Sequence, residues 1–359
     1  MKGKKYSFLT VLIVTAAVLI HIISSQSVLI EKYYSQIIYP VISGVLKFCF
    51  GWLPFSLGDI IYAVLILWLL SKLIRFIISV KNGLIKKSNL IVGIIKGGKL
   101  LLLLYIFFNI LWGLNYNRVG IAEQLNLNPA KYSLQDLILI DSILLEKVNT
   151  CKASLLIRND SLKQTSAIFN EGSNAYNLLS KKYAFLKYSK ASVKPSAWGW
   201  LGNYVGFIGY YNPFTGEAQV NTTVPQFIQP FTVCHEIGHQ LGYAKENEAN
   251  FVGYLAATAS PDTTFHYSAY LDLFMYVQRS LFEVDTVSTR RFTHNLSPTV
   301  KADIKLLKEF DKKHKSFAEP VFRWLYGKYL QQNQQPSGIL SYDEVTGLLL
   351  AYYKKEGKI

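Results

Sequence analysis

The sequence predicts an α+β protein, in which three N-terminal transmembrane helices precede a mainly helical domain with a small β-sheet. Half of the 359 residues are hydrophobic and the mean hydropathy is +0.20, which is too apolar for a purely soluble protein. The long uncharged apolar stretches all lie near the N-terminus. Helical periodicity dominates the remainder, with one interruption rich in glycine, aromatic and β-branched residues.

Three apolar stretches, at about residues 6–24, 55–73 and 99–116, are predicted to cross a bilayer. The first is an uncharged run of 19 residues, the second is apolar up to Lys72, and the third contains Asn109 as the single polar residue of its central part. Each approaches the ~20 apolar residues that a transmembrane helix needs. A signal peptide is the alternative for the first run, but no convincing small-residue cleavage site follows it, so an uncleaved anchor is favoured.

Basic residues predict the orientation of these spans. Residues 72–99 carry seven Lys or Arg and no acid, whereas residues 25–54 carry two Lys and one Glu. The positive-inside rule therefore places the N-terminus and the second loop in the cytoplasm. Residues 1–115 form the predicted membrane domain, and residues 116–359 form an extracytoplasmic domain. Most of the net charge of +15 lies in the membrane domain, where it indicates topology and contact with membrane lipid, and no nucleic-acid-binding motif accompanies it.

The second domain begins and ends with helices. The first and last predicted helices open with capping-box-like sequences at residues 133–136 and 341–344. The region between Pro195 and Pro230 is typical of strands and turns. Helices are predicted at residues 134–148, 165–182, 265–281, 299–313, 318–331 and from Ser341 onward.

An H-E-x-x-H motif runs from His235 to His239. On a helix the two histidines lie one turn apart on the same face, so both can bind one Zn²⁺ while Glu236 lies beside the metal. Gly242 is a predicted helix stop, which allows a following helix to supply a third ligand. Two solvated histidines on an exposed helix are the alternative, and their one-turn spacing disfavours it.

The third ligand is to be chosen between Glu246 and Glu248. Residues 246–257 are predicted to be helical, so Glu246 and Asn250 share a face, whereas Glu248 is rotated by about 200° from Glu246. This favours Glu246 as the ligand and Asn250 as a hydrogen-bond partner that orients a histidine. Glu248 remains the alternative ligand.

These two motifs resemble those of the gluzincin metallopeptidases, and the resemblance covers about residues 195–260. In that family the first Glu of the second motif binds the metal and the residue four positions later steadies the site; this chain has Asn250 where many members have Asp. The resemblance implies a zincin-like domain that acts on a peptide or protein substrate. In such a domain an edge strand just before the metal helix holds the substrate, so residues 218–222 are expected to be that strand, with an ordinary sheet edge as the alternative. It implies Zn²⁺ as cofactor, held by His235, His239 and Glu246, with Glu236 as the catalytic base. Because zincins commonly use a His or Tyr to stabilise the oxyanion, the candidates for that task are His266, Tyr267 and Tyr342.

The whole chain also resembles an uncharacterised bacterial family of three-span membrane proteins, on the basis of its spans and of residues 211–217, Tyr-Asn-Pro-Phe-Thr-Gly-Glu, before the His-Glu helix. This resemblance implies a location in the bacterial cytoplasmic (inner) membrane with a periplasmic C-terminal domain. The expected function is that of a membrane-anchored zinc metallopeptidase. A zinc-containing sensor or a protein that binds peptides or cell-wall fragments, and a purely structural zinc site, are alternatives, against which the presence of Glu236 argues. The sequence does not define the oligomeric state.

Overall fold

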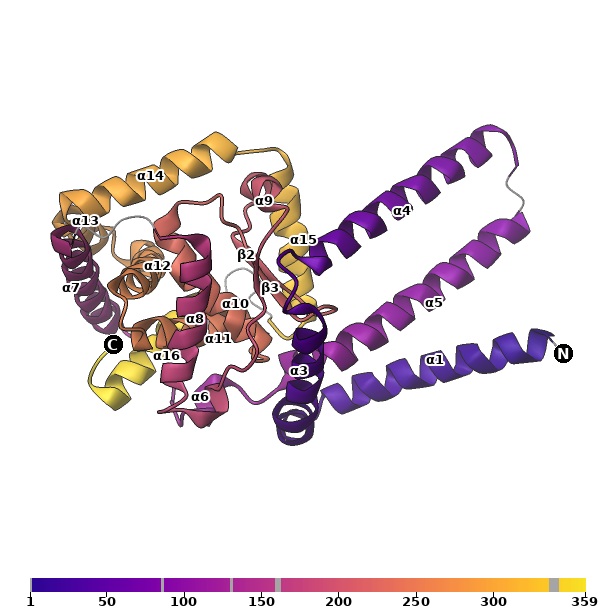
Figure 1. Cartoon of the computed structure of the whole chain (residues 1–359), viewed down its shortest axis with the longest axis horizontal. Coiled ribbons are helices and arrows are strands. Elements are labelled where there is room, and N and C mark those ends of the chain that lie inside the picture. Colours follow the sequence, from indigo (N-terminus) through magenta and orange to yellow (C-terminus); the bar gives the residue numbers. More distant parts are fainter. Residues whose placement is uncertain (1, 85–86, 130–131, 159–162, 336–341) are drawn as a thin grey trace.

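Three long helices project in the same direction from a globular part that contains one small β-sheet (Figure 1). The prediction of a largely helical α+β architecture is confirmed at this level. The computed structural model describes residues 2–84, 87–129, 132–158, 163–335 and 342–359.

The projecting helices are α1 (Lys2–Ser24), α4 (Leu57–Lys81) and α5 (Lys87–Leu111). By length and composition α4 and α5 can each cross a membrane, and α1 can do so together with the helical segment that follows it, from which it is bent by 95°. The prediction of a membrane protein is therefore confirmed. The helix of the third predicted span begins earlier than residue 99 and ends at Leu111, because residues Gly113–Asn117 turn into a short buried 3-10 helix, η2.

The segment between α1 and α4, expected to be a loop, is instead helical. It comprises α2 (Ser27–Leu29), the π-helix η1 (Ile30–Ile38) and α3 (Tyr39–Phe50). Its only acidic residue, Glu31, is buried and forms an ion pair at 2.9 Å with Arg118 of the globular part. The segment is ordered by such distant contacts, which its own sequence does not reveal.

The N-terminus and the α4–α5 connection lie at the same end of the molecule, far from the globular part (Figure 1). We therefore expect a membrane-impermeant maleimide applied to intact cells to label Leu306→Cys on the globular part and to spare Leu84→Cys in the connection. Both parent side chains are exposed, and Cys49→Ser removes the exposed native thiol. Cell lysis should make both positions reactive. Labelling of position 84 alone in intact cells would reverse the orientation.

The sheet consists of β1 (Val193–Pro195), β2 (Gly209–Asn212) and β3 (Glu217–Val220) in the order β1-β3-β2. Strand β3 is parallel to β1 and antiparallel to β2. The prediction of an edge strand at residues 218–222 is wrong, because β3 is paired on both sides and completely buried. The outer strand nearest the H-E-x-x-H motif is β2. Residues 199–202, predicted as strand or turn, instead form the start of helix α9 (Gly199–Val205), whereas Trp198 lies in the turn before it.

Helices surround this sheet. The predicted capping box at the start of α7 (Leu134–Arg158) is confirmed. The Ser133 N–H donates to Asp136 Oδ2 at 2.9 Å, and the Asp136 N–H donates to Ser133 Oγ at 3.2 Å. The predicted cap at Ser341 lies outside the described residues.

The remaining helices are α6 (Ile121–Gln124), α8 (Thr165–Leu179), η3 (Ala184–Leu186), η4 (Gln226–Ile228), α10 (Gln229–Gln240), α11 (Glu246–Ala259), α12 (Thr263–Val284), α13 (Thr286–Asn295), α14 (Pro298–His314), α15 (Ala318–Gln332) and α16 (Tyr342–Glu356).

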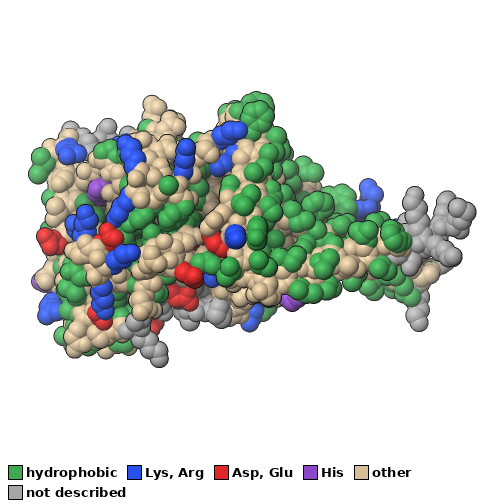
Figure 2. Space-filling model, turned by 90° about the horizontal axis from the view of Figure 1, so that it is seen from below, with side chains coloured by type: hydrophobic (Ala, Val, Ile, Leu, Met, Phe, Trp, Pro, Cys, Tyr) green, Lys and Arg blue, Asp and Glu red, His purple; other side chains and the backbone are tan. Residues whose placement is uncertain are grey.

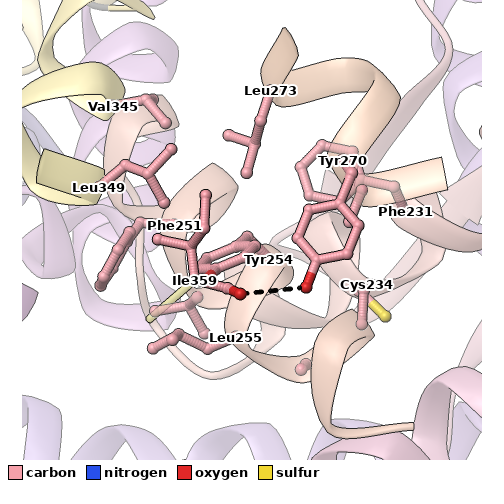
Figure 3. Packing of buried hydrophobic residues seen from close by; sticks show 14 of the residues in the cluster. Phe231, Cys234, Phe251, Tyr254, Leu255, Tyr270, Leu273, Val345, Leu349 and Ile359 are labelled. Atoms are coloured by element: carbon pink, nitrogen blue, oxygen red, sulfur yellow. Dashed lines mark hydrogen bonds between the residues drawn. The ribbon is translucent and has the colours of Figure 1, made fainter. Parts of the chain in front are cut away.

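The hydrophobic core includes the apolar faces of α10 and α11, which pack against residues of α12 and α16 (Figure 3). Cys234 of α10 and Phe251 of α11 are among its fully buried members. Burial of this much apolar surface fixes the two helices against the rest of the domain. Their polar residues, which carry both sequence motifs, are thereby held in one place.

Candidate metal centre

Both histidines of the H-E-x-x-H motif are held in a defined orientation on α10. His235 Nδ1 lies 2.6 Å from Asn250 Oδ1, and His239 Nδ1 lies 2.8 Å from the carbonyl oxygen of Tyr243. Since both partners are acceptors, the neutral form of each ring carries its hydrogen on Nδ1 and has a free lone pair on Nε2. The two ring centroids are 4.7 Å apart. This is the tautomer and spacing that two imidazole ligands of one metal need.

Glu246 completes a cluster of three potential ligands. Its Oε2 lies 3.3 Å from His235 Nε2, and its Oε1 lies 3.5 Å from His239 Nε2. The potential ligand atoms of the three residues all lie within 4.8 Å of one another. The structure thus brings together the three residues that the two motifs single out.

Two glycines allow α11 to reach this position. Gly242 has a φ of +86° and ends α10, as the sequence predicts, so the chain can turn back within a few residues. At Gly253 an added Cβ would lie 3.0 Å from the backbone nitrogen of His235. The two helices are therefore in backbone contact beside the motif, and a larger residue at position 253 would push them apart.

Glu248 faces a different part of the molecule. Its Oε1 lies so close to Gly120 that an added Cβ there would be 2.6 Å away, and it accepts a hydrogen bond from the Ile121 N–H at the start of α6. Burial raises the pKa of Glu248, and the charges of Lys245 and Arg118 partly offset this effect. Of the two glutamates considered as third ligand, only Glu246 faces the histidines.

Glu236 is buried against strand β2. An added Cβ at Gly209 would lie 2.4 Å from Glu236 Oε1, so the strand approaches the carboxylate as closely as only glycine permits. Burial raises the pKa of Glu236 to about 7, although the charges of His235 and His239 lower it. Its Oε2 is buried and has no hydrogen-bond partner among the residues that the structure describes. A buried carboxylate oxygen without a partner is costly. Glu248 Oε2 shares this property, so it is the position of Glu236 beside the two histidines that makes it the candidate for a functional role.

The residues of the cluster fit a zinc ion. Two imidazole nitrogens and one carboxylate, with a second carboxylate beside them, are the donor set of a catalytic zinc site with an open position. Burial raises the pKa of Glu246, but the charges and hydrogen bonds of the two histidines hold it well below its usual value. Burial lowers the pKa of His235, yet its hydrogen bond with Glu246 raises it to about 9. The site thus attracts positive charge.

Sequence reasoning missed two residues at this centre. The Tyr326 hydroxyl of α15 donates to Glu246 Oε1 at 2.7 Å, and Asp272 of α12 is close enough for the charge of His235 to lower its pKa, which burial raises to about 7. No local signal marks Tyr326, since it is 80 residues from Glu246 in the chain.

The predicted oxyanion donors are engaged elsewhere. The Tyr267 hydroxyl donates to Asp303 of α14, and His266 Nε2 lies 2.7 Å from the Ser260 carbonyl oxygen. The side chain of Tyr342 lies outside the described residues. Tyr326 is therefore the hydroxyl donor that the described structure places at the cluster.

Comparison with known proteins identifies a family. A family model described as "Protein of unknown function (DUF3810)" matches residues 34–350. The chain belongs to this family. No curated protein and no solved structure matches the chain. Because the match includes α4, α5 and both sequence motifs, the apolar helices and the three-residue cluster are parts of one DUF3810 unit.

In this DUF3810 protein the N-terminal region helps to support the cluster. The last carbonyl groups of α10 need partners, because a helix leaves its C-terminal carbonyls unpaired. Trp112, just after α5, donates to the His239 carbonyl at 3.1 Å, and Tyr39 of α3 donates to the Gln240 carbonyl at 2.9 Å. Tyr39, before α4 in the chain, and Trp112, after α5, therefore both hold the C-terminal end of α10, the helix that carries the motif.

Proposed function

We propose that this protein is a membrane-anchored zinc metallopeptidase that hydrolyses peptide bonds outside the cytoplasm. The observation that carries the proposal is the arrangement of His235, His239 and Glu246 around a common point, with the unpaired Glu236 carboxylate beside them. Zn²⁺ held by the three residues would polarise the scissile carbonyl and lower the pKa of a water molecule toward 7. The gluzincin-like spacing of the motifs supports the same assignment.

Glu236 carries out the proton transfers as the general base and acid. Its carboxylate takes the proton of the attacking water and passes it to the leaving amine. Burial supports this role, because it raises the pKa of Glu236 to about 7 and so makes the carboxylate a stronger base than an exposed glutamate. Tyr326 holds Glu246 by its hydroxyl and keeps the carboxylate turned toward the histidines.

Strand β2 takes the substrate-pairing role expected for residues 218–222. It is the outer strand on the side of Glu236, and Gly209 at its start touches the Glu236 carboxylate. A peptide that adds to the edge of β2 would have its backbone next to the catalytic base.

A zinc-containing membrane sensor, or a protein that binds peptides or cell-wall fragments with little turnover, is the second candidate. The hydrogen bonds from Trp112 and Tyr39 to the end of α10 favour it, since they connect the cluster directly to the apolar helices. The unpaired Glu236 favours the enzyme, because metal binding alone requires no carboxylate at that position.

The purified full-length protein decides between these functions. We expect about one zinc per chain by elemental analysis, and hydrolysis of members of a broad peptide library that a chelator abolishes and added zinc restores. Stoichiometric zinc without turnover on any library would favour the sensor. A protein that binds no zinc at micromolar concentrations would contradict both functions.

A further inference from the structure

Helix α15 carries an apolar face that nothing in the described part of the chain covers. Phe317, the N-cap residue of the helix, and Val321, Trp324 and Leu325 within it have exposed fractions of 93, 58, 61 and 54%. Their spacing of four, three and one residues places them on one side of the helix. Lys328 continues this side, and no acidic residue of α15 lies on it. Such a face is typical of a helix that lies in a membrane interface.

The opposite face of α15 touches the metal centre and the apolar helices. The Tyr326 hydroxyl contacts Glu246, and the ring of Tyr329 lies 6.4 Å from that of Phe108 on α5. Figure 1 shows α15 at the side of the globular part from which the long helices project, running across their direction. The helix therefore separates the candidate metal centre from the surface where a bilayer around α4 and α5 would begin.

Helix α9 continues the apolar surface toward α4. Trp200 and Tyr204 of α9 have exposed fractions of 58 and 42%. The residue before α9, Trp198, connects it to the first turn of α4, since the Trp198 indole N–H donates to the Asp59 carbonyl oxygen at 3.3 Å. Just after the C-terminal end of α9 the chain meets α15, because the ring of Phe207 lies 6.3 Å from that of Phe322.

The helices η1 and α3 likewise have one face packed against the globular part and one exposed apolar face. Their inward side is held in the globular part by the buried Glu31–Arg118 ion pair. Their outward side exposes apolar residues at a spacing of three or four positions, at the base of α1 and α5 in Figure 1. These residues are Tyr33, Ile37, Val41, Val45 and Phe48, with exposed fractions between 50 and 69%.

We propose that these three surfaces, the outward faces of η1–α3, α9 and α15, form an apolar collar that lies in the interfacial layer of the bilayer. The collar is continuous with α4 and α5, whose exposed side chains are mainly apolar, and it contains the tryptophan and tyrosine residues that membrane interfaces favour. On the face seen in Figure 2, hydrophobic side chains gather on the half of the molecule from which the long helices project. A soluble surface of this size and composition would promote association. Lipid is therefore its occupant.

The collar defines a substrate class, an inference that rests on the proposed peptidase function. Since α15 contacts lipid on one face and Glu246 on the other, the metal centre works within one helix diameter, ~10 Å, of the membrane surface. The substrates are then polypeptides that are inserted in the same membrane or attached to it by a lipid, cleaved close to where they leave the bilayer.

Spin labels test the position of the collar without requiring activity. The full-length protein with Cys49→Ser would be reconstituted in vesicles of phosphatidylethanolamine and phosphatidylglycerol. It would be labelled at Trp324→Cys or Val45→Cys, with Leu306→Cys on the exposed side of α14 as the matched control. We expect oxygen to relax the labels at positions 324 and 45 more than a water-soluble nickel chelate does, and the reverse at position 306.

Two outcomes would overturn the placement in lipid. Preferential relaxation of labels 324 and 45 by the nickel chelate would place the collar in water. Low accessibility of these labels to both reagents would mean that protein, such as a second copy of the chain, covers the surface. Neither outcome depends on zinc or hydrolysis, so the proposed peptidase function stands or fails separately.

The substrate class has its own measurement. One peptide cleaved by the enzyme would be presented in soluble form and attached to a lipid in the same vesicles. We expect faster cleavage of the attached form, and Trp324→Glu should reduce this advantage while leaving cleavage of the soluble form unchanged. Leu306→Glu should change neither rate. Equal cleavage of both forms by the parent protein would contradict the inference about substrates.

Discussion

Replacement of Glu246 by alanine is expected to remove zinc from the protein. Its carboxylate is the acidic group that faces both His235 and His239, at 3.3 and 3.5 Å, so the variant loses one of the three proposed ligands together with its negative charge. We expect affinity to fall by more than the ~10- to 100-fold that is typical when only a ligand's hydrogen-bond partner is lost. Elemental analysis and competition with a zinc chelator on the purified variant measure the change.

Glu248→Ala is the matched control, since the same change is made two residues away on the same helix and at an equally buried side chain. It should leave zinc in place, because Glu248 faces Gly120 and α6. Asn250→Ala should fall between the two variants, since it removes the hydrogen bond to His235 Nδ1 but no ligand. Retention of zinc in Glu246→Ala together with its loss in Glu248→Ala would contradict the assignment of the ligands.

Replacement of Glu236 by glutamine is expected to abolish most hydrolysis while zinc remains bound. Glutamine has nearly the same shape, so it fits against Gly209, but its amide cannot accept the proton of the attacking water. Loss of a general base costs about 10²- to 10⁴-fold in rate. The turnover number on a peptide that the parent protein cleaves, measured with zinc content on the same sample, tests this result.

The isosteric change Glu248→Gln controls for the loss of a buried carboxylate near the same helices, and it should retain most of the activity. If Glu236→Gln loses zinc as well as hydrolysis, Glu236 supports the metal or the fold and is not the proton acceptor. Full activity of Glu236→Gln would remove the chemical basis of the proposed mechanism.

Local sequence determined the elements on which the candidate centre is built. A four-residue spacing places His235 and His239 on one face of any helix, and Gly242 is suited to the positive φ that ends α10. The same helical geometry favours Glu246 over Glu248 without reference to any long-range contact. The apolar helices followed from composition alone, because a stretch of ~20 apolar residues has few other stable environments.

Tertiary structure decided which distant residues support and cover that centre. Tyr326, Trp112 and Tyr39 reach it from 80 to 201 residues away in the chain, and a periodic pattern carries no information about such partners. The same limit explains the wrong prediction for β3, because the pattern of one strand does not reveal whether neighbours pair with both of its edges. It also explains the helical segment at residues 27–50, whose charged Glu31 is stable inside the protein only because the fold brings Arg118 to it.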